Sequence, residues 1–263
     1  MKIETLAWEF ALKNSIFGFK LTVEDILITA RKNGCRIYSY QEYPALLQEL
    51  DITEYAEAKL GLTYVLRHDT KAEYFIFYRD ELPSDLKLFV ILHELGHIAM
   101  KHSFGGGVLG KSPDNRLEKR QELEADLFAC EVLAPSCVLK QLHIETEEEI
   151  RRLGILPPDF VGQYASKIHG ADSTSGSWTE KQLLRKFRHA IRLYRTGRPS
   201  PSPRGYPFLT VFMLCTALSA FSCLFGCSGQ ISKPLHFSVP SAALQQYPAY
   251  RPAANTTVPT AVN

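Results

Sequence analysis

The segment His93-Glu94-Leu95-Gly96-His97 contains the residue types of a metal-dependent hydrolase. On an α-helix, residues four positions apart lie on one face, so the imidazoles of His93 and His97 can reach the same metal ion. Glu94 is placed to accept a proton from a water molecule at that metal. This H-E-x-x-H pattern is typical of zinc peptidases, but it also occurs by chance, and paired histidines on a helix face are often structural. A third ligand would strengthen the prediction of a metal site.

A second acidic segment supplies a candidate for that ligand. Glu122 and Asp126 are four residues apart and share a face of the helix predicted around them. We predict that Glu122 binds the metal and that Asp126 holds the N–H of a ligand histidine, which fixes the imidazole tautomer. Two histidines and one glutamate leave a fourth position open, as catalytic zinc requires. Glu124 lies roughly 200° around the helix and is interpreted as solvated, an interpretation that also stays open for Glu122.

The elements that must position these residues can be read from the patterns around them. Apolar residues at helical spacing surround both motifs; no proline interrupts residues 84–102, where Ser84 is the expected N-cap, and Pro135 closes the second helix. A further helix is expected from Pro44 to about Leu60. The sequence therefore predicts an α+β fold with a small sheet packed on the helix that carries the H-E-x-x-H motif.

Strands are expected at residues 35–40, 62–66 and 73–79, which are rich in β-forming side chains. The last of these has two interpretations. It is either an edge strand beside the active-site cleft, with which a peptide substrate can pair, or a buried strand of the core.

Residues 22–135 resemble the ImmA/IrrE family of metallopeptidases. The resemblance rests on a strand that runs towards HELGH at 93–97, and on the helix Glu122-Leu-Glu-Ala-Asp-Leu-Phe-Ala-Cys-Glu-Val-Leu-Ala-Pro135. The HELGH motif is shared by many zincins. The second motif, which starts at a glutamate and closes at a proline, is more specific to the family.

This resemblance implies a zincin-like domain with one zinc ion held by His93, His97 and Glu122, and with Glu94 as general base. It implies hydrolysis of a protein substrate, because the family includes peptidases that cleave helix-turn-helix repressors. Direct binding of nucleic acid is not expected from it.

Charge is distributed unevenly along the chain. Residues 1–180 contain all 28 acidic and 20 basic residues, whereas residues 181–263 contain ten bases and no acid. The six cysteines include no C-x-x-C pair, and their pattern indicates a reducing compartment.

Gly110-Lys111-Ser112 lacks the strand–loop–helix context of a nucleotide-binding loop. His102, five residues after His97, lies off the metal face of an uninterrupted helix and is interpreted as a surface or packing residue.

Residues 208–227 form an uncharged run of twenty residues. As a helix this run would span about 30 Å, the thickness of a bilayer core. Eight bases at 181–204 precede it and two follow it, which predicts a single-pass membrane protein with its peptidase domain in the cytoplasm. A buried hairpin or core helix is the alternative, since hydroxyl side chains dilute the run.

The predicted organisation is a zincin-like metallopeptidase domain at 1–140, a helical extension at 141–204, a transmembrane helix at 205–228 and a disordered tail at 229–263. The predicted function is zinc-dependent endopeptidase activity on a regulatory protein, such as a repressor. Two alternatives remain. One is a non-proteolytic sensor that keeps the metal site, and the other is a DNA-binding regulator that uses the basic amphipathic helix at 179–196.

Overall fold

The computed structural model of the chain describes residues 2–68, 71–105, 107–170 and 176–196. Every described element belongs to one compact unit, residues 1–204. The predicted membrane helix at 205–228, with its apolar run, and the predicted tail lie outside the described residues. Within the described ranges, no helix combines the length and the apolar character needed to cross a bilayer.

A five-stranded sheet has the order β1-β3-β2-β5-β4. Its strands are β1 (Cys35–Ser39), β2 (Gly61–His68), β3 (Lys71–Tyr78), β4 (Phe104–Gly105) and β5 (Val108–Leu109). The first three confirm the predicted strands. The short pair β4 and β5 forms in a glycine-rich segment for which no strand was expected.

Strand β3 lies in the interior of the sheet, because it pairs in parallel with β1 and antiparallel with β2. Its side chains alternate between two apolar clusters, with Ile76 in one and with Phe75 and Phe77 in the other. The interpretation of this strand as a sheet edge is therefore wrong, and the interpretation as a core strand is confirmed.

The described part of the chain contains ten helices. They are α1 (Ile3–Asn14), α2 (Val23–Lys32), α3 (Pro44–Glu49), α4 (Thr53–Ala58), α5 (Ser84–Met100), α6 (Asn115–Leu133), α7 (Ser136–Leu142), α8 (Glu147–Leu153), α9 (Pro158–Gly170) and α10 (Trp178–Arg195). Of these, α2, α4 and α5 make the main helix contacts with the sheet. The single helix expected at 44–60 is divided into α3 and α4, because Asp51 adopts a positive φ of 55°. Pro83, and not Ser84, is the N-cap of α5, and no side chain caps this helix.

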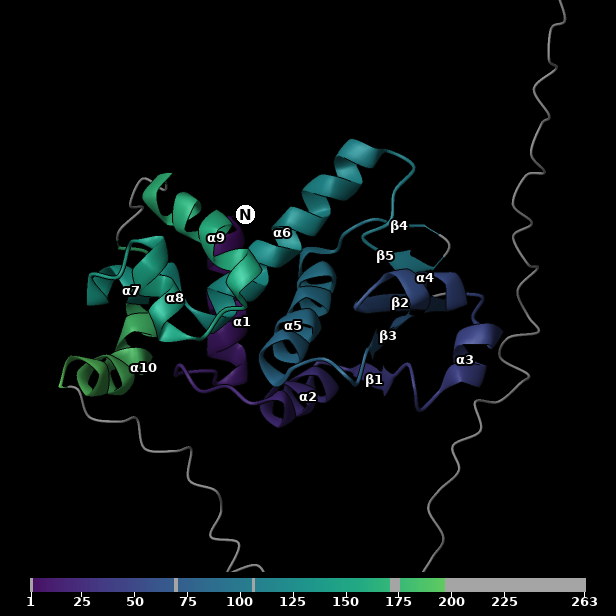
Figure 1. Cartoon of the computed structure of the whole chain (residues 1–263), viewed down its shortest axis with the longest axis horizontal. Coiled ribbons are helices and arrows are strands. Elements are labelled where there is room, and N and C mark those ends of the chain that lie inside the picture. The colour runs from purple at the N-terminus through teal and green to yellow at the C-terminus, as the bar shows by residue number, and fades with distance from the viewer. Residues whose placement is uncertain (1, 69–70, 106, 171–175, 197–263) are drawn as a thin grey trace, which may run out of the picture. The chain divides into compact units, whose positions relative to one another are not determined.

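Helix α5 lies between the sheet and α6, and packs against β2, β3 and α6 (Figure 1). Residues of the predicted helical extension share the core of the predicted peptidase domain. Phe187 of α10 contacts Phe17 and Phe19, with ring centroids 6.3 and 5.9 Å apart. The apolar side of α10 is thus buried, as its amphipathic pattern predicts.

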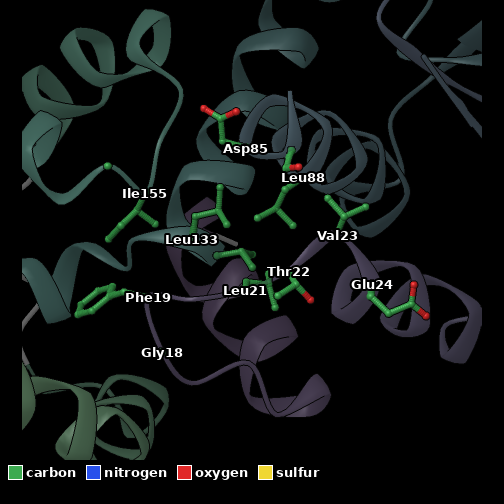
Figure 2. Close-up of a pocket in the computed structure, with 13 residues that line it drawn as sticks. Gly18, Phe19, Leu21, Thr22, Val23, Glu24, Asp85, Leu88, Leu133 and Ile155 are labelled. Carbon is green, nitrogen blue, oxygen red and sulfur yellow. The ribbon is translucent and has the colours of Figure 1, made fainter. Parts of the chain in front are cut away.

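A cavity of about 490 Å³ lies where α2 and α5 begin (Figure 2). Its walls are largely apolar and include Leu21, Leu88, Leu133 and Ile155. The cavity reaches only the first turns of α5, and no residue of the H-E-x-x-H motif lines it. The residues of the H-E-x-x-H motif lie further along α5, outside this cavity.

Candidate metal centre

Helices α5 and α6 bring together the side chains of His93, His97 and Glu122, whose ligand atoms all lie within 4.8 Å of one another. The two helices can approach closely because Gly96 faces the ring of Phe128, where a Cβ would lie only 3.0 Å from Cδ1. The sequence-predicted ligands therefore meet at a helix–helix contact.

The distances between the donor atoms test whether this group suits zinc. His93 Nε2 lies 3.0 Å from His97 Nε2 and 3.2 Å from Glu122 Oε2, and His97 Nε2 lies 3.9 Å from the same oxygen. Two donor atoms on one tetrahedral zinc, with bonds of roughly 2.0–2.1 Å, are about 3.3 Å apart. Both the chemistry of the donors and their spacing fit the metal.

Asp126 lies behind His93, as its position four residues after Glu122 predicts. Its Oδ1 is 2.8 Å from His93 Nδ1, so the imidazole can donate this N–H and keep Nε2 directed at the ligand group. Burial alone would lower the pKa of His93, but hydrogen bonds to Asp126 and Glu122 raise it to about 10. Burial and the charge of His93 lower the pKa of His97 to about 2.

Glu94 is buried beside the ligand group, with 5% of its surface exposed. Its Oε2 accepts a hydrogen bond of 2.8 Å from the hydroxyl of Thr63 on β2. Burial raises the pKa of Glu94, although the charge of His93 and the Thr63 hydroxyl act in the opposite direction. A carboxylate with a raised pKa is suited to accept and return a proton near neutral pH. Thr63 carries no recognisable signal in the sequence.

Lys59, which follows α4, is a second residue that the sequence does not reveal. Its Nζ lies 2.6 Å from Glu122 Oε1, so the two oxygens of this carboxylate have different partners. Burial alone would raise the pKa of Glu122, but hydrogen bonds from His93 and Lys59 lower it. Lys59, Glu94, His97 and Glu122 line one narrow cleft, together with residues of β2 and β5.

His102 is not a surface residue. It is 8% exposed, and its Nδ1 lies 2.8 Å from Nδ1 of His97. Glu124, interpreted from the sequence as solvated, places Oε2 3.1 Å from Nε2 of His102. His102 is therefore the packing residue of the two alternatives, and the interpretation of Glu124 as purely solvated is wrong, because its half-buried carboxylate pairs with His102.

Comparison with known protein families identifies the part of the chain that contains the candidate centre. Residues 46–154 match the family model described as the IrrE N-terminal-like domain, and this range includes α5, α6 and every residue of the candidate centre. No curated protein and no solved structure gives a significant match. Residues 46–154 therefore form a domain of the ImmA/IrrE peptidase family.

Proposed function

We propose that the protein is a zinc-dependent endopeptidase of the ImmA/IrrE type. The observation that carries the proposal is the meeting of His93, His97 and Glu122 at ligand spacing, beside the buried carboxylate of Glu94. Membership of a peptidase family supports the reaction class, and the donor set supports the metal.

In this proposal His93, His97 and Glu122 hold one zinc ion. Zinc bound there would polarise the scissile carbonyl and lower the pKa of water towards about 7. Glu94 accepts a proton from the attacking water and passes it to the nitrogen of the leaving amine. The hydroxyl of Thr63 fixes the orientation of Glu94 through the bond at Oε2, and Asp126 fixes the tautomer of His93.

The proposed substrate is a regulatory protein. A helix-turn-helix repressor fits the kind of substrate that family membership suggests. A non-proteolytic sensor built on the same metal site is the alternative, and the two functions differ in their need for Glu94.

Replacement of Glu94 by glutamine separates these functions. The amide cannot accept the proton, so Glu94→Gln should retain zinc and fold but lose proteolysis. We would measure zinc content and compare the protein N-termini of cells that express the wild type, Glu94→Gln or the exposed control Glu148→Gln. New N-termini that depend on Glu94 support the peptidase, whereas identical sets in all three would contradict it.

A further inference from the structure

A chain of hydrogen bonds leads away from the ligand group on the far side of His97. Nε2 of this imidazole faces His93, while Nδ1 faces His102 at 2.8 Å. From His102 the chain continues to Glu124, with 3.1 Å between Nε2 and Oε2. The side chains of His97 and His102 are 2% and 5% exposed, so the bond between them is shielded from water, whereas the side chain of Glu124 is 32% exposed.

The end of α5 explains how His102 reaches this position. Lys101 adopts a left-handed conformation, with φ 56°, and its N–H binds the carbonyl of Ile98. The N–H of His102 then binds the carbonyl of His97 at 3.1 Å. These two bonds form a Schellman motif, which turns the chain back over the last turn of the helix. The imidazole of His102 is thereby carried onto that of His97.

Only one arrangement of protons lets His97, His102 and Glu124 form both hydrogen bonds while His97 keeps Nε2 free to bind a metal. A neutral imidazole has one donor and one acceptor nitrogen. If Nε2 of His97 is the ligand, its Nδ1–H must donate to Nδ1 of His102. His102 must then carry its own proton on Nε2, where it donates to the carboxylate of Glu124.

We propose that His102 and Glu124 are positioning residues for the metal centre, a role that rests on the proposed zinc site. They hold His97 in the tautomer and ring orientation that present Nε2, and the carboxylate increases the basicity of His97 through the intervening ring. The two ligand imidazoles are thus supported differently. His93 has a carboxylate in direct contact, whereas His97 reaches one only through a second histidine.

Three variants of the full chain test this role. His102→Phe keeps a ring but removes both hydrogen bonds, so zinc affinity should fall by about 10–100-fold. His102→Asn places an amide oxygen near the former Nδ1 and should recover part of that loss. Glu124→Gln keeps an acceptor but removes the charge, and should give a smaller loss than His102→Phe. The matched controls are the exposed His189→Phe and Glu148→Gln, which should bind zinc as the wild type does.

Zinc affinity would be measured by competition with a chromophoric chelator, and ligand geometry by the visible absorption of the Co²⁺-substituted protein. Weakened zinc binding and an altered cobalt spectrum in His102→Phe, partly restored in His102→Asn, would support the role. Wild-type affinity and spectrum in His102→Phe and Glu124→Gln would overturn it. If His102→Phe does not fold, the half-buried Glu124→Gln decides alone. Failure of the wild type to bind zinc through His93 would instead overturn the metal centre itself.

Discussion

Gly110 lies against the imidazole of His97, and a Cβ on this glycine would be 2.4 Å from Cε1 of the ring. The backbone of Gly110 adopts φ 79° and donates a hydrogen bond to the carbonyl of Ser103. The loop after α5 therefore closes directly over one of the proposed ligands. No side chain can be added at this position without moving either the loop or the imidazole.

Gly110→Ala is expected to reduce zinc affinity at least about tenfold, because the new methyl group displaces a ligand ring. Gly154→Ala is the matched control. It has the same left-handed backbone, with φ 60°, but nothing lies within 4 Å of its added Cβ. Both variants should lose about 1–2 kcal/mol of stability from backbone strain, and only Gly110→Ala should bind zinc more weakly. Chelator competition and thermal unfolding would measure the two effects, and equal zinc affinities would contradict the prediction.

Zinc binding should depend on pH through His93. Its pKa of about 10 in the metal-free protein lies above the ordinary value, so protonated His93 stabilises that state fully below about pH 6.5. This stabilisation is lost as the pH rises towards 10. A ligand imidazole must be neutral, so zinc has to displace the proton. Zinc affinity should consequently rise about tenfold per pH unit between about pH 7 and 9. Titration calorimetry in buffers of different ionisation enthalpy would count the released proton, and an affinity independent of pH would exclude this linkage.

Tyr40 offers a prediction of stability that does not involve the metal. Its hydroxyl is buried and has no hydrogen-bond partner in the part of the chain that the structure describes. Tyr40→Phe removes this unsatisfied group and should raise the free energy of unfolding by about 1 kcal/mol. The control is Tyr164→Phe, since the hydroxyl of Tyr164 donates a 2.6 Å bond to the carbonyl of Ala134, and its loss should lower stability by about 1 kcal/mol. Denaturant unfolding would compare them, and destabilisation by Tyr40→Phe would contradict the argument.

The proposed membrane placement of residues 208–227 makes a prediction about fractionation. The full chain should sediment with membranes and resist extraction by high salt or alkaline carbonate, because apolar burial rather than charge would hold it there. A chain that ends at Arg204 should be soluble and retain zinc. Leu214→Arg with Leu218→Arg tests the apolar run itself, since two charges at the centre of a span oppose insertion. Recovery of the unmodified full chain in the soluble fraction would argue against the span.

The metal-ligand geometry could be predicted because it depends on local periodicity. A spacing of four residues fixes two side chains on one helix face, whichever fold surrounds them. His93 and His97, and likewise Glu122 and Asp126, therefore share a helix face as their spacings suggest, and the packing of α5 on α6 brings the two pairs together. Glu122 faces the ligand group and Glu124 does not, because the two residues lie roughly 200° apart around the helix.

The supporting residues could not be found in this way. The position of the His102 side chain depends on where α5 ends. The left-handed conformation of Lys101 turns the chain back at this point, so His102 does not continue the helix. Thr63 and Lys59 reach the centre through the packing of β2 and α4, and strand pairing over long sequence distances has no local signature. The same limit applies to β3, whose interior position depends on pairing with β1, more than thirty residues earlier in the chain.

Helix α6 is anchored unevenly. Its second half, from Leu127 to Leu133, is buried in the core, whereas residues 115–120 are exposed or half-buried, with Glu122 between them. Zinc bound to Glu122 would tie the less buried half of α6 to α5. Loss of the ion should then be seen first as faster amide hydrogen exchange in the opening turns of α6, while the end of the helix exchanges only as the whole domain unfolds.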